Sequence, residues 1–152
     1  MEEVKKVLFL CMANSARSQM AEGLLRALGL GRWEVQSAGV FSSYLHPLAI
    51  RAMEEIGIDI SRQTSKSVNR VIKKKFDYMI TLCDDAAKSC PHFPGAGKRY
   101  HWSFEDPAAA TGTIEERLAE FRKTRDKLKI KIEEFLRPEP SEIPDPIASF
   151  KF

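Results

Sequence analysis

Apolar and polar residues follow two different periods along this chain, one typical of β-strands and one typical of α-helices, and segments of the two kinds alternate. Four segments, residues 4–10, 33–39, 77–83 and 98–102, carry apolar runs or alternate between apolar and polar positions, as β-strands do. Between and after them, apolar residues recur every three or four positions in residues 18–28, 47–56, 67–76 and 113–136, as in amphipathic helices. This alternation predicts an α/β fold, a doubly wound, four-stranded parallel sheet flanked by helices.

Length and composition indicate a single soluble domain. The chain has 152 residues, 43% hydrophobic and 30% charged, which is enough for one core. We expect residues 1–136 to form one catalytic domain and residues 137–152, which contain four prolines, to form an extended or disordered tail. We find neither a membrane-spanning stretch nor a signal peptide, so we expect a cytoplasmic protein without membrane contact.

Charge and cysteine count narrow the class of partner. A net charge of +3 suits a small anionic substrate and gives little support for nucleic-acid binding. The three cysteines are an odd number without a secreted disulfide framework, which indicates thiols kept for chemistry in a reducing compartment. We also expect the protein to be a monomer.

The first cysteine opens the motif C-x5-R-S, from Cys11 to Ser18, between a predicted strand and a predicted helix. Backbone N–H groups at a helix N-terminus and a guanidinium favour a thiolate, and the same groups bind a tetrahedral oxyanion. We therefore expect Cys11 to be a nucleophile below an anion-binding loop that Arg17 closes, with Ser18 donating a hydrogen bond to the thiolate or to a leaving group. The residues of this loop are Met12, Ala13, Asn14, Ser15, Ala16, Arg17 and Ser18.

Cys83 and Cys90 could bind metal, take part in redox chemistry or simply be buried. Their spacing is wider than the two to four residues of paired zinc ligands, and no second pair is present even if His92 joins them, so we expect no metal. Cys83 ends a predicted strand beside the one that leads to Cys11, so it could attack a sulfur-bound adduct there. Cys90 would then resolve the Cys11–Cys83 disulfide, with residues 84–89 looping out. Two structural thiols remain the alternative.

Asp106 precedes Pro107, which disfavours helical backbone at the aspartate and favours a turn. A carboxylic acid held on such a turn after a strand is a candidate general acid for a leaving hydroxyl. A purely structural Asp-Pro turn is the alternative. His46, His92 and His101 have no partner that the sequence reveals, and we interpret them as packing or surface residues.

Several motifs together resemble one family. C-M-A-N-S-A-R-S-Q-M-A-E-G at 11–23, S-A-G at 37–39, I-S-R-Q-T-S at 60–65, T-L-C-D-D-A-A at 81–87 and H-W-S-F-E-D-P-A-A-A-T-G-T at 101–113 are similar to the thioredoxin-coupled arsenate reductases. Those enzymes share the low-molecular-weight protein tyrosine phosphatase fold, and the resemblance covers about residues 4–136. It implies that Cys11 attacks arsenate, that Arg17 and the loop amides hold its oxygens, and that Asp106 protonates the departing hydroxyl.

The resemblance also implies a source of electrons. Cys83 would attack the Cys11–arsenic adduct and release arsenite, and Cys90 would take over to give a Cys83–Cys90 disulfide. Thioredoxin, or alternatively a glutaredoxin, would reduce that disulfide, so no bound cofactor is expected.

Some members of this family bind potassium near the loop. Three of their ligands match Asn14, Glu22 and Ser37, whereas the fourth, which is acidic in those relatives, is Lys66 here. One hypothesis is that the Lys66 ammonium replaces the ion; the alternative is a solvated lysine.

Two other functions stay open. A low-molecular-weight tyrosine phosphatase would use the same loop and Asp106, but such enzymes resemble D-P-Y at the acid, where this chain has Ala108 and Ala109 after Pro107. We therefore expect only weak phosphatase activity beside the reduction of arsenate. A non-enzymatic oxyanion sensor could use the three thiols as a binding site, but no DNA-binding motif supports it.

Overall fold

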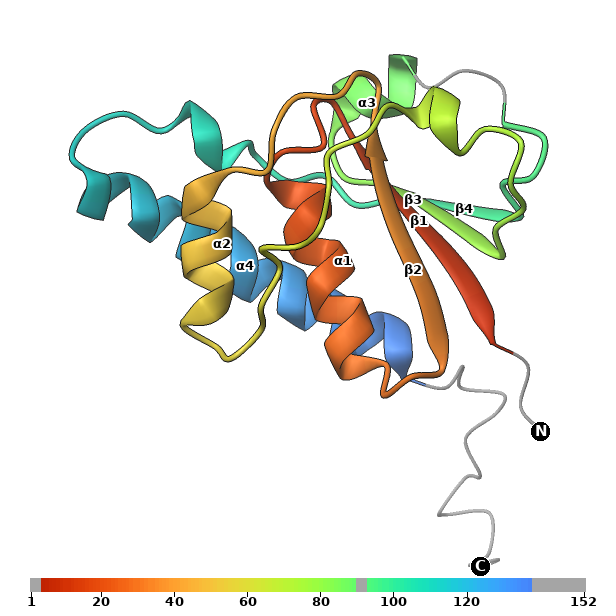
Figure 1. Ribbon diagram of the computed structural model, residues 1–152, viewed down its shortest axis with the longest axis horizontal. Coiled ribbons are helices and arrows are strands. Elements are labelled where there is room, and N and C mark those ends of the chain that lie inside the picture. The colour runs from red at the N-terminus through yellow and green to blue at the C-terminus, as the bar shows by residue number, and fades with distance from the viewer. Residues whose placement is uncertain (1–3, 90–92, 138–152) are drawn as a thin grey trace, which may run out of the picture.

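A four-stranded sheet in the order β2-β1-β3-β4 lies at the centre of the computed structural model, which describes residues 4–89 and 93–137. The strands are β1 (Lys5–Cys11), β2 (Trp33–Gly39), β3 (Tyr78–Thr81) and β4 (Lys98–His101). All three strand pairings are parallel. The chain goes from β1 to β2 on one side and returns to β3 on the other, so the predicted doubly wound sheet is confirmed (Figure 1).

Three helices, α1, α2 and α4, lie together on one side of the sheet, while the short α3 lies near the ends of the strands (Figure 1). Their bounds are α1 (Arg17–Leu28), α2 (Pro47–Glu54), α3 (Asp84–Ser89) and α4 (Ile114–Leu136), with two short 3-10 turns, η1 (Val68–Arg70) and η2 (Pro107–Ala109). The start of α4 is set by a capping box, in which Thr113 accepts a hydrogen bond from Glu116 N–H and the Glu116 side chain accepts one from Thr113 N–H. Within the described part of the chain, no helix is both long and apolar enough to cross a membrane.

Two predicted segments differ from the structure. Only η1 is helical in residues 67–76, because Val68 and Val71 are both buried and one 3-10 turn is enough to place them on the same side. Residues 84–89, which we expected to loop out, form α3, whose first turn carries Asp84 and Asp85, and acidic residues are favourable at a helix start. The predicted tail lies, from residue 138 onward, outside the described residues.

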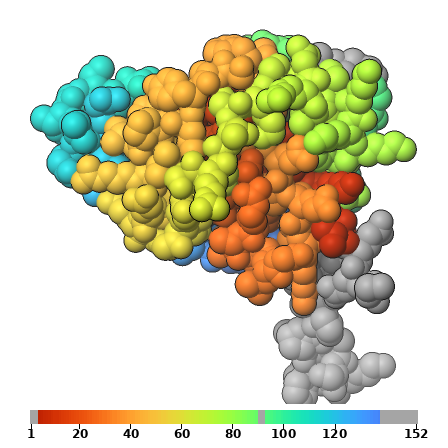
Figure 2. All heavy atoms as spheres, in the orientation of Figure 1, coloured from red at the N-terminus to blue at the C-terminus, as the bar shows by residue number. Residues whose placement is uncertain are grey.

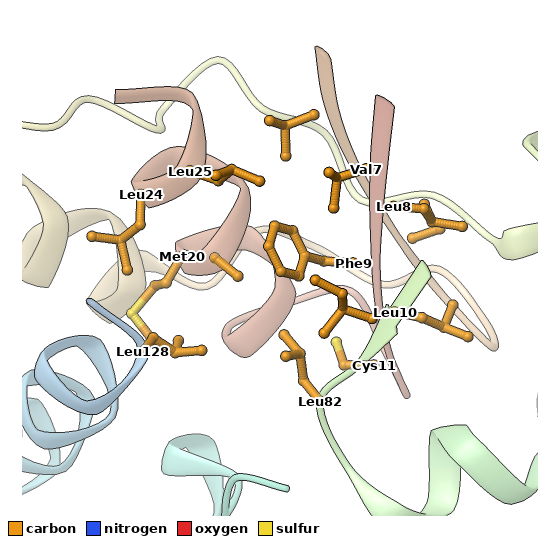
Figure 3. Packing of buried hydrophobic residues seen from close by; sticks show 14 of the residues in the cluster. Val7, Leu8, Phe9, Leu10, Cys11, Met20, Leu24, Leu25, Leu82 and Leu128 are labelled. Atoms are coloured by element: carbon orange, nitrogen blue, oxygen red, sulfur yellow. The ribbon is translucent and has the colours of Figure 1, made fainter. Parts of the chain in front are cut away.

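The hydrophobic core holds the end of β1 in place. Residues 7–10 are fully buried, as expected for a central strand covered on both faces. Phe9 points toward Met20 and Leu25 of α1, whereas Leu8 points to the opposite side of β1 (Figure 3). Cys11 ends this strand with only 2% of its surface exposed, so the core fixes where its sulfur lies.

The carboxyl ends of the strands meet at one edge of the sheet. Cys11 pairs with Gly39, and Leu10 pairs with Thr81, so the segments that follow β1, β2 and β3 converge there. A Cβ atom at Gly39 would lie 2.3 Å from Phe41 O and 2.7 Å from Met12 O, and only glycine allows this close approach. The segment after α2 runs across the front of α1 toward the same edge (Figures 1 and 2).

Candidate active site

The loop between β1 and α1 leads into a helix N-terminus at which, among the described residues, the N-cap side chain makes no capping hydrogen bond. Ala16 occupies the N-cap position of α1 and has no polar side chain to accept the N–H groups of the first turn. Asn14 has a φ of 51°, a left-handed conformation that asparagine tolerates better than most residues and that curls the loop. Open helix N-termini of this kind bind oxyanions.

A chain of hydrogen bonds runs through buried side chains to the sulfur of Cys11. Ser18 Oγ lies 2.8 Å from Cys11 Sγ and accepts a hydrogen bond of 2.8 Å from Asn14 Nδ2. The same amide nitrogen donates to Ser37 Oγ at 3.0 Å, and Ser37 donates to Glu22 Oε1 at 2.7 Å. A thiolate sulfur can only accept, so with Cys11 ionised the Ser18 hydroxyl is the donor of the bond between them. The structure thus places Ser18 where the predicted donor should be.

Lys66 contacts the anion loop through its backbone, and replacement of the ion by its ammonium stays a hypothesis. Its backbone N–H donates to Asn14 Oδ1 at 2.8 Å, but its ammonium contacts Thr64 O at 3.5 Å. Among the described residues, the cation bonded to Glu22 is Arg26, with NH2 2.8 Å from Oε2. Arg26 stands four residues after Glu22 on α1, a spacing at which opposite charges pair, so the sequence did carry this signal.

Arg17 connects the anion loop to the Asp-Pro turn. Its guanidinium is buried and donates from NH1 to Phe104 O at 2.9 Å, while NH2 lies 3.8 Å from Asp106 Oδ2. Asp106 adopts an extended conformation, as its place before Pro107 predicts, and its Oδ1 accepts a hydrogen bond of 2.9 Å from Ala108 N–H. The carboxyl group is therefore held beside the loop, with its second oxygen on the side of Arg17.

A pocket of about 280 Å³ joins these groups. Its lining contains the predicted Cys11, Met12, Ala13, Ser15, Ala16, Arg17 and Asp106, and also Ser43, Tyr44, His46, Ala108 and Arg117. A larger hollow of about 620 Å³ lies on the other side of Asp106 but contains neither Cys11 nor Arg17, so the smaller pocket is the one that holds the reactive groups.

His46 is buried and packs against the Phe121 ring, as expected of a packing histidine, but it also lies in the pocket wall, which the sequence analysis did not predict. Its Nδ1 accepts a hydrogen bond of 3.0 Å from Leu48 N–H, so it caps α2, with Pro47 at the first helical position. Burial lowers the pKa of His46, Arg117 lowers it further, and Asp106 acts in the opposite direction. The ring is therefore neutral at neutral pH and leaves Arg17 and Arg117 as the cations of the pocket.

Cys83 lies at the same edge of the sheet as Cys11, just after β3, which pairs directly with β1. Its Sγ accepts a hydrogen bond of 3.4 Å from Ala86 N–H in α3, and its side chain is nearly buried. Both thiols are free in the structure. Cys90 and His92 lie outside the described residues. Within residues 4–89 and 93–137, no group of three or more His, Cys, Asp or Glu side chains is arranged to hold a metal ion.

Comparison with known proteins identifies relatives over nearly the whole chain. A family model described as low molecular weight phosphotyrosine protein phosphatase matches residues 6–144. An arsenate reductase of Bacillus subtilis (strain 168) is 47% identical over 133 residues, which cover 88% of this chain and 96% of that protein. An arsenate reductase of Staphylococcus aureus (strain Newman) is 43% identical over 131 residues, which cover 86% of this chain and 95% of that protein.

Two solved structures show the same fold. An arsenate reductase in the phosphate binding state superposes with a TM-score of 0.75 at 40% identity, covering 86% of this chain and 95% of the other. A low molecular weight protein tyrosine phosphatase from T. tengcongensis superposes with a TM-score of 0.72 at 29% identity, covering 87% of this chain and 97% of the other.

Proposed function

This chain belongs to the low molecular weight phosphotyrosine protein phosphatase family, and we propose that it acts within that family as an arsenate reductase. The observation that carries the proposal is a pair of free thiols at one edge of the sheet, Cys11 beneath the anion loop and Cys83 after the adjacent strand. Hydrolysis of a phosphate ester needs only the first of them, whereas reduction of an oxyanion needs a second thiol to supply electrons.

The first step forms a bond between sulfur and arsenic. Arsenate occupies the pocket, where Arg17 and the open N–H groups at the start of α1 hold its oxygens. The Cys11 thiolate, stabilised by Ser18, attacks arsenic, and one arsenic–oxygen bond breaks. The carboxyl group of Asp106 gives its proton to the departing hydroxyl, which leaves as water.

The second step reduces arsenic. The Cys83 thiolate attacks Cys11 Sγ, a disulfide forms between the two sulfurs, and the sulfur–arsenic bond breaks. The electron pair of that bond stays with arsenic, which leaves as arsenite in the +3 state. The two cysteines together have lost two electrons, so the reaction balances without a bound cofactor.

The third step restores Cys11. Cys90 attacks the sulfur of Cys83, giving a Cys83–Cys90 disulfide and returning Cys11 to the thiolate. A dithiol of the thioredoxin class, or alternatively of the glutaredoxin class, then reduces the remaining disulfide. We also propose weak hydrolysis of phosphate esters as a side activity, because the pocket of about 280 Å³ has room for a phosphate group above Cys11 and Arg17.

A coupled assay tests the proposal. Arsenate-dependent oxidation of NADPH is measured with thioredoxin and thioredoxin reductase, and in a second arm with glutaredoxin, glutathione and glutathione reductase. Hydrolysis of para-nitrophenyl phosphate is followed in parallel for the parent and for Cys83→Ser. We expect Cys83→Ser to lose arsenite release but to keep the hydrolysis, because the anion loop is intact. Arsenite release by Cys83→Ser at the parent's rate would contradict the role of Cys83. A parent protein that hydrolyses para-nitrophenyl phosphate but releases no arsenite would contradict the proposal and favour a phosphatase.

A further inference from the structure

His101 bridges the chain on both sides of Cys83. Its Nδ1 lies 2.7 Å from Oγ1 of Thr81, the last residue of β3, and its Nε2 lies 2.7 Å from Oδ1 of Asp84, the first residue of α3. Between these two partners the chain has only Leu82 and Cys83. One imidazole therefore ties together the end of the strand and the beginning of the helix that flank the second thiol.

The polarity of this bridge follows from the carboxylate. An ionised Asp84 can only accept, so Nε2 of His101 donates to its Oδ1, and Nδ1 is the ring nitrogen that shares a hydrogen bond with the Thr81 hydroxyl. The hydrogen bond from His101 holds the pKa of Asp84 below its usual range, followed by one from Ser103. The two hydrogen bonds of His101, to Thr81 and to Asp84, are both 2.7 Å long, although the Asp84 side chain is exposed.

Cys83 is itself part of the start of α3. Its Sγ accepts from Ala86 N–H at 3.4 Å, and its carbonyl oxygen accepts from Ala87 N–H at 3.1 Å. To reach the sulfur of Cys11, Cys83 Sγ has to give up the first of these bonds. A helix of six residues has little stability of its own. After loss of this bond, the start of α3 is held by the bond from Ala87 N–H to Cys83 O and by the tie from Asp84 to His101.

We propose that Asp84 and His101 are positioning residues that restrain Cys83 and so set the rate at which it moves from α3 to the adduct on Cys11. The inference rests on the proposed role of Cys83 as the second thiol. The tie resists unwinding of the first turn of α3, and breaking it lowers the barrier to that movement. Weakening the tie accelerates the disulfide step, whereas a residue needed only for folding would slow it when removed.

The neighbouring Asp85 offers a matched control. Asp84→Asn and Asp85→Asn each remove one carboxylate from the first turn of α3, but within the described residues only Asp84 bonds to His101. Decay of the Cys11–arsenic adduct and release of arsenite are followed by quenched single-turnover mixing and mass spectrometry. We expect Asp84→Asn to be about two- to fivefold faster than the parent, as suits an exposed hydrogen bond, with an unchanged KM for arsenate and an Asp85→Asn rate equal to the parent's.

A second pair of variants tests whether the two residues act together. Asp84→Asn weakens the tie, because the amide oxygen accepts less strongly than a carboxylate, and His101→Asn removes it together with the bond to Thr81. His101→Asn is therefore expected to accelerate the step at least as much as Asp84→Asn, and the double variant no more than His101→Asn alone. A rate equal to or below the parent's in Asp84→Asn, an equal acceleration in Asp85→Asn, or additive effects would overturn the proposal.

Amide hydrogen exchange at Ala86 and Ala87 provides a readout that needs no arsenate. We expect faster exchange in Asp84→Asn and His101→Asn and parent-like exchange in Asp85→Asn. If the parent protein releases no arsenite, the proposed function fails. The amide exchange rates then still show whether the contact between Asp84 and His101 restrains the start of α3. Parent-like exchange in all three variants would refute it.

Discussion

The hydroxyl of Ser18 lies 2.8 Å from Cys11 Sγ and is oriented by Asn14, whose amide donates to the same oxygen. The amide is held in turn on both sides, because Ser37 accepts from its nitrogen and Lys66 N–H donates to its oxygen. A donor aimed at the sulfur before substrate arrives costs no reorganisation when negative charge develops there.

Ser18→Ala is expected to slow the reaction of Cys11 about tenfold or more, because a hydrogen bond to a charged group contributes roughly 1.5–3 kcal/mol. The rate of alkylation by iodoacetamide as a function of pH, and single-turnover arsenite release, measure the effect. Ser61→Ala, at an exposed position where the hydroxyl bonds to Asp59, is the control and should match the parent. Alkylation of Ser18→Ala at the parent's rate throughout the pH range would contradict this role of the hydroxyl.

Cys11→Ser should release no arsenite, because it lacks the nucleophilic sulfur.

Arg26 is expected to matter more than Lys66 for the anion loop. Arg26→Ala leaves the buried Glu22 carboxylate without the guanidinium that bonds to it. We expect the free energy of unfolding, measured by urea denaturation, to fall by roughly 1–2 kcal/mol; the loss is not larger because the guanidinium is half exposed and water screens the pair. Lys66→Ala should leave activity unchanged, since the contact of Lys66 with Asn14 comes from its backbone N–H.

The salt in the assay buffer tests the same point. Because Arg26 already neutralises Glu22, exchanging potassium for sodium should change the parent's rate less than twofold, whereas Arg26→Ala should be partly restored by potassium. Strong activation of the parent by potassium would show that an ion, and not the guanidinium, serves this position.

Asp106→Asn is expected to lower the rate of the chemical step roughly a hundredfold while leaving oxyanion binding nearly intact, the usual scale for a lost general acid. An asparagine can still accept the hydrogen bond from Ala108 N–H, so the turn should keep its shape. Quenched-flow measurement of the first step and competition by phosphate for the pocket separate rate from binding. A parent-like rate would mean that the Asp-Pro turn is structural only.

Glu55 joins the end of α2 to α4 and should make stability depend on pH. It accepts hydrogen bonds from Arg122 Nε at 2.8 Å and from Arg125 NH1 at 3.0 Å. The bond from Arg122 is the main reason that the pKa of Glu55 falls from 4.5 to about 2. Since the pKa is lower in the folded state, this stabilisation is complete above about pH 4.5 and is lost as the pH falls toward 2.

Glu55→Gln should therefore reduce the free energy of unfolding by about 1 kcal/mol at pH 7, and the difference from the parent should shrink below pH 4.5. Urea denaturation at several pH values measures it. Glu54→Gln, at the exposed neighbouring position, is the matched control and should leave stability unchanged at both ends of the range. A difference that stays constant down to pH 2.5 would contradict the assignment.

The elements that the sequence determined by itself are local ones. The start of α2 at Pro47, the extended Asp106 before Pro107 and the capping box of Thr113 each depend on residues at most four positions apart. The C-x5-R-S loop is local in the same sense, because its strand, its turn and its helix start follow one another directly. Patterns of this range can be recognised from residue types alone.

The tertiary structure decided which distant residues complete the site. Asn14 meets Ser37 and Lys66 across 23 and 52 positions of sequence, and Arg17 meets Phe104 across 87. Each meeting depends on the register of parallel strands and on the path of the crossovers that connect them. Register and path are set by packing of the whole core, and no local period of apolar residues specifies them, so the tie of His101 to Asp84 appeared only in the folded chain.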